Sequence, residues 1–363
     1  MTAAAQNDIV LDARDIVRHF GGGWRFPFGE APLIRAVDGV SLAIRRGETF
    51  AIVGESGCGK STLARLMLCL IPPTSGSVTF QGREITSAAP EELRRLRRDM
   101  QIIFQDPFGS LNPRMSIGAL VGEPLSVHGI ATGRERAARV AEMLRLVGLP
   151  PDHAGRYPHE FSGGQRQRIG IARALATRPS LLVGDEPVSA LDVSIRAQVI
   201  NLLEDLKSEL GLTLILVAHD LAVIRHTSDR IAVMYLGEIV ELAGRDSLFE
   251  TPRHPYTRSL IDAIPVPVPG ARNARTLLQG DPPSPVAPPP GCRFHTRCPY
   301  AEDICRTERP VLREIAPAHR VACHLAEDLP AHVLPGALET VSAVRQQRVA
   351  LFAKAQQISA SNA

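Results

Sequence analysis

Short apolar runs alternate with longer amphipathic stretches along most of the chain. Three apolar runs favour buried strands: Thr49–Val53, Leu181–Val183 and Leu212–Val217. Apolar residues recur at helical spacing in four other stretches: Lys60–Cys69, Arg134–Leu146, Gln165–Ala176 and Ile195–Leu210. Because strands that alternate with helices usually pair in parallel, we expect an α/β fold whose parallel sheet is covered on both faces.

The two ends of the chain differ from this pattern. Between Ile9 and Gly47, alternating apolar residues predict short strands around a glycine-rich loop at 21–23. Nine prolines in residues 265–290 predict a stiff linker to a cysteine-containing segment at 291–325. We therefore expect a domain at 9–250, a C-terminal region at 251–328, and a tail at 329–363 with one weak helix near 340–355.

Charge and hydropathy narrow the class of protein. Lys and Arg number 41 against 38 Asp and Glu, a net charge of +3, so we expect no nucleic-acid partner. The arginine-rich stretch at 91–99 is interpreted as a solvated helix face. The longest apolar runs have six residues, whereas a membrane helix needs about 20. The first residues also lack the basic start and apolar core of a secretory signal. We expect a cytoplasmic protein without membrane spans.

A phosphate-binding motif follows the first predicted buried strand. Residues 54–61 fit the pattern G-x-x-x-x-G-K-[ST], and a predicted helix begins at Lys60. Glycines let backbone N–H groups approach phosphate oxygens, and the helix start adds its dipole. Lys60 would neutralise the β- and γ-phosphates, the Ser61 hydroxyl would hold Mg²⁺, and Thr62 would reach the α- and β-phosphates. The alternative is a fortuitous glycine-rich turn. The candidate ATP-binding residues are Gly54, Glu55, Ser56, Gly57, Cys58, Gly59, Lys60, Ser61 and Thr62.

Polar residues follow two other predicted strands. Asp185 and Glu186 follow Leu181–Val183 after a single glycine, Gly184, and His219 follows Leu212–Val217. Strand ends of this kind meet at the binding edge of an open α/β sheet. We expect Asp185 to bind Mg²⁺ and Glu186 to orient or deprotonate the attacking water. His219 could contact the γ-phosphate or Glu186, or be a structural histidine.

A second anion site is predicted at another helix start. Ser162, Gly163, Gly164 and Gln165 precede the helix at 165–176 and offer exposed N–H groups and a hydroxyl. Two such sites for one nucleotide in one chain would be odd. The second site makes sense if it serves a nucleotide held by a partner chain.

With these motifs in this order, residues 9–250 resemble the ATP-binding cassette (ABC) ATPases. The resemblance implies a P-loop NTPase fold with a RecA-like core, an antiparallel β subdomain and a helical subdomain at about 106–177. It also implies a head-to-tail dimer in which Ser162–Gln165 act in trans and Asp192 lies across the interface. Gln105 would contact Mg²⁺ and the attacking water. Phe20 is the expected adenine-stacking residue, with Trp24 as the alternative.

Three segments narrow the resemblance further. Residues 104–114, 156–161 and 254–257 are similar to the ATPase subunits of bacterial oligopeptide/dipeptide importers, most closely the second of their paired ATPases. This implies ATP hydrolysis at the cytoplasmic face of the inner membrane. The expected partners are two permease subunits docked near 106–125, a second ABC ATPase, and an extracytoplasmic solute-binding protein.

Two alternatives to peptide import stay open. An importer of another small solute, such as nickel or glutathione, would use a related ATPase. A soluble ABC ATPase of DNA repair or translation is disfavoured for three reasons. Lys60 and Ser162 are separated by only 102 positions, the chain holds one cassette, and its net charge is weak.

Four cysteines fall close together after the proline-rich stretch. Cys292, Cys298, Cys305 and Cys323 are separated by 5, 6 and 17 residues. In a cytoplasmic protein such a group favours a metal over disulfides, and the absence of a C-x₂₋₄-C pair disfavours zinc. The spacing leans toward an iron–sulfur cluster, and some peptide-importer ATPases that the chain resembles carry a [4Fe–4S] cluster on similar cysteines. Zinc and free thiols stay as alternatives, and neighbouring histidines could replace a ligand: His295, His319 and His324.

Overall fold

We describe the fold from a computed structural model of the whole chain. It describes residues 8–22, 24–25, 29–30, 32–106, 109–264 and 280–332. Residues 265–279, which form most of the predicted proline-rich linker, lie outside these ranges, as does the predicted tail helix near 340–355. Within the described ranges, no helix is both long and apolar enough to cross a membrane.

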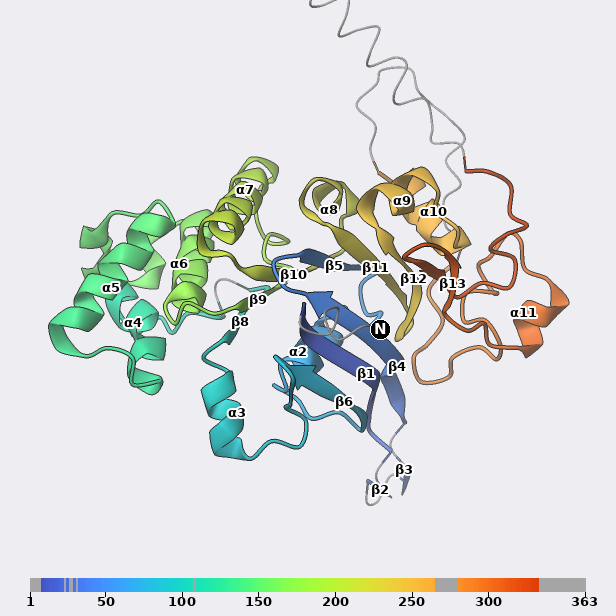
Figure 1. Cartoon of the computed structure of the whole chain (residues 1–363), viewed down its shortest axis with the longest axis horizontal. Coiled ribbons are helices and arrows are strands. Elements are labelled where there is room, and N and C mark those ends of the chain that lie inside the picture. The colour runs from blue at the N-terminus through green and yellow to red at the C-terminus, as the bar shows by residue number, and fades with distance from the viewer. Residues whose placement is uncertain are drawn as a thin grey trace, which may run out of the picture.

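The centre of the molecule is an eight-stranded sheet in the order β13-β14-β12-β11-β5-β10-β9-β8 (Figure 1). Its strands are β5 (Thr49–Val53), β8 (Met100–Ile103), β9 (Leu181–Asp185), β10 (Thr213–Ala218), β11 (Arg230–Tyr235), β12 (Glu238–Gly244), β13 (Arg313–Ala316) and β14 (His319–Val321). Strands β11, β5, β10, β9 and β8 pair in parallel. The sequence predicts β5, β9 and β10 and their parallel pairing, but not β8 and β11.

The other half of the sheet corrects the expectation of a purely parallel sheet. Strands β11 and β12 form an antiparallel hairpin. Its two turn residues, Leu236 and Gly237, both have positive φ, at 45° and 87°. A turn with two positive φ values matches the twist of a tight hairpin, so the chain reverses instead of crossing over through a helix. The antiparallel pairing then continues through β14 to β13.

Apolar side chains leave the parallel strands toward both faces of the sheet. In β10, Leu214 and Leu216 belong to one buried cluster, while Ile215 and Val217 belong to another. This two-sided burial explains why the strands are continuous apolar runs.

One face of the large sheet packs against α2 (Lys60–Met67) and a second, antiparallel sheet in the order β4-β1-β6-β7. The elements on this side are β1 (Ile9–Phe20), β4 (Ile34–Arg45), β6 (Ser75–Phe80), β7 (Arg83–Glu84) and α3 (Pro90–Leu96). The short strands β2 (Trp24–Arg25) and β3 (Gly29–Glu30) pair with each other. The four-stranded sheet β4-β1-β6-β7 is the antiparallel β subdomain that the resemblance to ABC ATPases implies.

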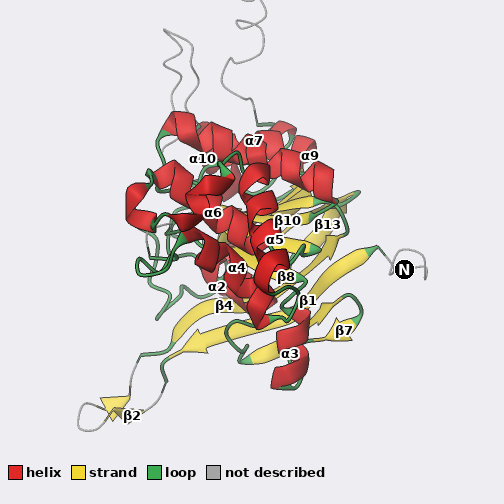
Figure 2. Ribbon diagram, turned by 90° about the vertical axis from the view of Figure 1, so that its left-hand side faces the viewer, coloured by secondary structure: helices red, strands yellow, loops and turns green. Residues whose placement is uncertain are grey.

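The opposite face is covered by helices, which Figure 2 shows stacked above the strands. They are α6 (Gly163–Leu175), α7 (Val193–Leu210), α8 (Leu221–Thr227), α9 (Arg245–Glu250) and α10 (Pro255–Asp262). Together with α6, the helices α4 (Ile117–Val127) and α5 (Gly133–Leu146) form a helical group at the left of Figure 1. Two short 3₁₀ turns, Pro151–Gly155 and Pro158–Glu160, connect α5 to α6.

The cysteine-containing segment is joined to the large sheet and is not a separate appendage. It carries α11 (Asp303–Thr307) and the hairpin β13–β14. Strand β14 pairs with β12, and the Ala322 N–H donates to the Val240 carbonyl over 2.8 Å. The sequence predicts a linker between the two parts but gives no sign of this edge pairing.

Candidate functional site

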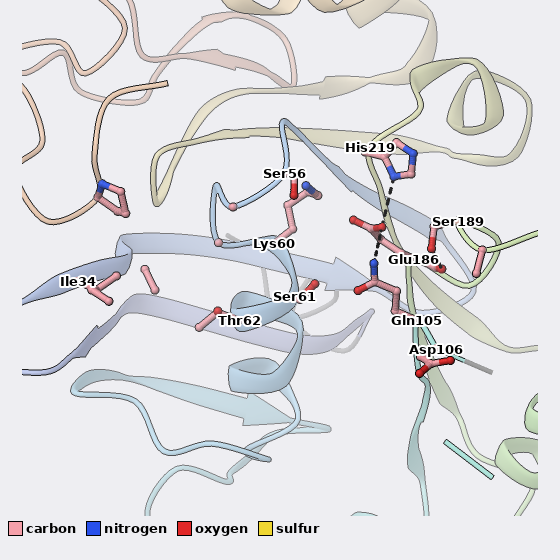
Figure 3. A pocket seen from close by; sticks show the side chains of 15 residues that line it. Ile34, Ser56, Lys60, Ser61, Thr62, Gln105, Asp106, Glu186, Ser189 and His219 are labelled. Carbon is pink, nitrogen blue, oxygen red and sulfur yellow. Dashed lines mark hydrogen bonds and ion pairs between the residues drawn. The ribbon is translucent and has the colours of Figure 1, made fainter. Parts of the chain in front are cut away.

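A cavity of about 740 Å³ lies at the carboxyl ends of β5, β9 and β10 (Figure 3). On one side it is bounded by the loop after β5 and the start of α2, and on the other by the residues that follow β8, β9 and β10. The lining residues are Ile34, Ala36, Ser56, Gly57, Gly59, Lys60, Ser61, Thr62, Gln105, Asp106, Glu186, Ser189, Ala190, His219 and Pro285. The cavity therefore brings together the phosphate loop, Glu186 and His219, which the sequence predicts from three separate segments.

The phosphate loop needs glycine where it turns into α2. Gly59 has φ +106°, and a Cβ there would lie 2.1 Å from the Ala36 carbonyl oxygen. The next residue, Lys60, is only 4% exposed and lines the cavity. Its ammonium group donates to the carbonyls of Gly54 and Glu55, each over 2.8 Å. The lysine is thus held inside the loop, beside the helix start where phosphates bind.

Three predicted loop residues do not line the cavity. A Cβ on Gly54 would lie 2.1 Å from the Met234 carbonyl oxygen, so this glycine allows close packing against β11. The Cys58 side chain is buried, and burial raises the pKa of its thiol. Glu55 is held by residues from the C-terminal part of the chain. Gly54, Glu55 and Cys58 therefore hold the conformation of the phosphate loop without lining the cavity.

The residue predicted to stack on adenine lies beside the cavity. Phe20 pairs with Ile34 in the β1–β4 ladder, and Ile34 lines the cavity while Phe20 does not. The Arg18 guanidinium lies 4.6 Å from the Phe20 ring centroid. The side chain of the alternative, Trp24, is outside the described part of the structure.

Two oxygen-bearing side chains form a candidate Mg²⁺ site. The Ser61 hydroxyl donates to Oδ1 of Asp185 over 2.6 Å. Asp185 is fully buried at the end of β9, and its other oxygen has no hydrogen-bond partner, although Arg65 lies 3.7 Å from it. Burial raises the pKa of Asp185, and the Ser61 hydrogen bond and the Arg65 charge oppose this shift. With the Gln105 amide nearby in the same cavity, these groups fit the all-oxygen ligand set of Mg²⁺.

Two polar side chains, Gln105 and His219, contact the carboxylate of Glu186. Its φ of +46° is uncommon for a residue with a side chain, and its N–H donates to the Val217 carbonyl. The Gln105 amide donates to Oε2 of Glu186 over 3.0 Å, and Nδ1 of His219 lies 3.3 Å from the same oxygen (Figure 3). Of the two contacts the sequence leaves open for His219, the structure shows the one with Glu186.

The signature residues lie away from this cavity. Ser162 is exposed at the N-cap of α6, where its hydroxyl accepts the Gln165 N–H and the Gln165 side chain accepts the Ser162 N–H. Gly164 allows α6 to approach α7, since a Cβ there would lie 2.5 Å from Cγ2 of Ile195. Asp192, at the start of α7, is also exposed. The described chain does not bring these residues to its own cavity.

The four C-terminal cysteines do not form a metal site in the structure. None of them is in a disulfide. Burial raises the pKa of Cys292, Cys298 and Cys323 to about 11, and nearby cysteine charges add to each shift. Across the described ranges, no group of three or more His, Cys, Asp or Glu side chains is arranged to hold a metal. The expectation of an iron–sulfur cluster therefore gains no support here, and neither does zinc.

Sequence reasoning missed the C-terminal residues that reach the phosphate loop. Arg297 donates to both carboxylate oxygens of Glu55 over 2.7 and 3.0 Å, and the Tyr256 hydroxyl accepts the Glu55 N–H over 2.8 Å. Pro285 lines the cavity itself. Arg297 follows Glu55 by 242 positions, and no local pattern in the sequence links them.

Comparisons with known proteins agree with this geometry. A family model described as ABC transporter matches residues 37–189, and one described as oligopeptide/dipeptide transporter, C-terminal region, matches residues 240–305. The chain is 51% identical over 331 residues to the oligopeptide transport ATP-binding protein AppF of Bacillus subtilis, covering 90% of this chain and 99% of that one. It is 50% identical to the probable peptide ABC transporter ATP-binding protein y4tS of Sinorhizobium fredii, covering 93% and 96%.

Solved structures with a similar fold also belong to ABC proteins. A post-hydrolysis dimer of the ATP-binding cassette MJ0796, bound to ADP and phosphate, superposes with a TM-score of 0.58 at 32% identity, covering 65% of this chain and 98% of that one. The protein cbiO1 of Clostridium perfringens, part of an ABC transporter complex, gives 0.57 at 28% identity, covering 67% and 91%. The chain belongs to the family of ABC transporter ATP-binding proteins and carries the C-terminal region of the oligopeptide/dipeptide transporters.

Proposed function

We propose that this chain is the ATP-hydrolysing subunit of an ABC importer for oligopeptides or dipeptides. One observation carries the proposal: Lys60 and Ser61 of the phosphate loop line a single cavity with Glu186 and Gln105, and Ser61 donates to the buried Asp185 behind it. The peptide substrate is supported by the names of the relatives and by the matched C-terminal region. Importers of nickel or glutathione remain the alternative.

The phosphates of ATP would lie against the loop N–H groups and the start of α2, where Lys60 offsets their charge. Ser61, Asp185 and Gln105 would hold Mg²⁺, which when bound draws negative charge from the β- and γ-phosphates. Glu186 would orient the attacking water and accept its proton. Gln105 and His219 both contact Oε2 of Glu186, so they hold its carboxylate in place.

The second nucleotide contact would come from another chain. Ser162–Gln165 form a helix start that does not line the cavity and at which Ser162 is exposed, which suits contact with the ATP of a partner. In this arrangement Asp192 would lie across the interface, and Phe20 would stack on adenine from beside Ile34. We infer a head-to-tail dimer with a second ABC ATPase, which closes around ATP and opens after hydrolysis.

The remaining partners follow from the proposed import. Two permease subunits would dock near 106–125 and hold the chain at the cytoplasmic face of the inner membrane, and a solute-binding protein would deliver the peptide outside. Residues 9–250 would form the ATP-binding domain and 251–328 the C-terminal region, with 329–363 as a tail. No nucleic acid is expected.

An iron–sulfur cluster on Cys292, Cys298, Cys305 and Cys323 is a separate proposal from the sequence. The structure adds no support to it, because no group of three or more His, Cys, Asp or Glu side chains in the described ranges is arranged to hold a metal. Protein purified without oxygen should then contain iron and sulfide. Their absence, with no visible absorbance, would dismiss the cluster.

The test of the proposed function is the substitution Glu186→Gln in the complex with the permeases. Losing a general base typically lowers the rate by about 10²–10⁴-fold. We expect hydrolysis to fall by that factor while a fluorescent ATP analogue still binds. Glu142→Gln is the matched control, because Glu142 forms a surface ion pair with Arg178 and neither residue lines the cavity. Unchanged hydrolysis in Glu186→Gln would refute the assignment of the base.

A further inference from the structure

Three of the five residues between Cys292 and Cys298 bury their side chains against the nucleotide-binding core. Arg293 is 6% exposed and forms ion pairs with Asp38 of β4 and Glu238 of β12. Phe294 is 1% exposed, and the Arg297 side chain is 5% exposed. This segment is therefore docked firmly on the strands that surround the phosphate loop.

An aromatic cluster fixes the segment in this position. The Phe294 ring lies 5.2 Å from the Tyr235 ring and 5.5 Å from the Tyr256 ring, and the two tyrosine rings are 4.7 Å apart. These three residues come from the cysteine-containing segment, β11 and α10. Ring contacts of this kind stabilise a packed position beyond simple area burial. The cluster therefore sets where Arg297, three residues after Phe294, can reach.

Arg297 and Tyr256 together hold one residue of the phosphate loop. Arg297 makes a two-bond contact with the Glu55 carboxylate, and the Tyr256 hydroxyl accepts the Glu55 N–H. The Glu55 carbonyl accepts a hydrogen bond from the Lys60 ammonium. The side chain, N–H and carbonyl of Glu55 are thus all engaged, and its backbone orientation is fixed from behind the cavity.

This restraint matters because the loop binds phosphate through its backbone. A loop that is already ordered loses less entropy when its ligand arrives, so its affinity is higher. The planar guanidinium of arginine suits a carboxylate geometrically, whereas a lysine would offer a single point charge. Arg297 does not line the cavity, and it reaches the phosphate loop through its ion pair with Glu55.

We propose that Arg297 is a positioning residue for ATP binding: through Glu55 it holds the phosphate loop in its binding conformation. The C-terminal segment thereby becomes a functional part of the nucleotide site. This inference rests on the proposed binding of ATP at the phosphate loop. Pro285, which accepts the Arg35 N–H over 3.1 Å and lines the same cavity, is a second contact between the C-terminal part and the site.

The test uses the full-length chain in its transporter complex. We expect Arg297→Ala to raise the KM for ATP about tenfold, which corresponds to about 1.4 kcal/mol, the scale of ordering one residue. The kcat should change by less than about threefold, because Arg297 does not touch the reacting groups. Glu55→Gln should reproduce this effect, and Arg297→Lys should fall between the wild type and Arg297→Ala. The double variant Arg297→Ala/Glu55→Gln should be no worse than either single variant.

Two further variants separate the possible outcomes. Arg313→Ala removes an arginine of the cysteine-containing segment that pairs with Glu327 and does not line the cavity, so it should leave the KM unchanged. Lys60→Ala should abolish binding of a fluorescent ATP analogue. If Lys60→Ala loses binding but Arg297→Ala, Arg297→Lys and Glu55→Gln all keep the wild-type KM, the positioning role is refuted and ATP binding stands. Additive effects of Arg297 and Glu55 also overturn it. If Lys60→Ala binds ATP normally, the proposed function itself fails.

Discussion

His254 gives the protein a predictable sensitivity to acid. It is 1% exposed at the N-cap of α10, and its Nδ1 accepts the N–H of Tyr256, the residue that holds the phosphate loop. Burial lowers the pKa of His254 from 6.5 to about 4, against the opposing charge of Glu241 and with the help of Arg258. Protonation would place a charge in a buried position and remove the capping acceptor.

The magnitude follows from the difference between the two pKa values. Between pH 6.5 and 4 the unfolded chain binds a proton at His254 that the folded chain does not, so stability falls as the pH is lowered through this window. One pKa unit corresponds to about 1.4 kcal/mol. From about pH 7.5 to about pH 5, this single group should therefore remove about 2 kcal/mol of the free energy of unfolding.

The assay is urea unfolding of the wild type and of His254→Asn at both pH values. Asn can still accept a hydrogen bond as an N-cap but does not titrate. Other titrating groups are common to both proteins, so they cancel in the comparison. We expect the wild type to lose about 2 kcal/mol more than the variant on acidification. Parallel losses in the two proteins would show that His254 is not kept neutral by burial.

Three further outcomes follow from single contacts. Gly164→Ala should strain the start of α6 by about 1–3 kcal/mol, because its Cβ would lie 2.5 Å from Ile195. Its melting temperature and ATP hydrolysis should drop, and adding Ile195→Ala should restore both; no restoration contradicts the packing argument. Glu241→Ala should lower the free energy of unfolding by about 3 kcal/mol, since Nε2 of His319 and the backbone N–H groups of Arg253 and His254 lose their partner; a loss below about 1 kcal/mol in urea unfolding would argue otherwise. EDTA should stop hydrolysis, and Asp185→Asn should raise the Mg²⁺ concentration for half-maximal rate; an unchanged requirement rejects Asp185 as a ligand.

Much of the nucleotide site can be predicted because its chemistry is local in sequence. Residues 54–61 hold the glycines and the helix start and directly follow strand β5, while Asp185 ends the buried strand β9 and Glu186 comes next. Parallel strands bring these ends to one edge whatever the rest of the chain does. The same argument places His219, which lies beside Glu186.

Other features depend on contacts that no local pattern encodes. The sequence does not predict helix α4, Ile117–Val127. Its first turn carries no charge, Pro124 lies inside it, and it has almost no polar face, so the sequence shows no clear amphipathic pattern there. The antiparallel edge depends on the backbone conformation at Leu236 and Gly237. The ion pair between Arg297 and Glu55 depends on an aromatic cluster drawn from three separate segments.

The central claim is that each ATP is held between the phosphate loop of one chain and the Ser162 helix start of another. The most direct measurement places a photo-crosslinking amino acid at position 162 in the Glu186→Gln background and illuminates the transporter complex with and without ATP. We predict an ATP-dependent crosslink from position 162 to the phosphate loop of the partner ATPase. A crosslink within the same chain, or none while ATP is bound, would contradict the shared site.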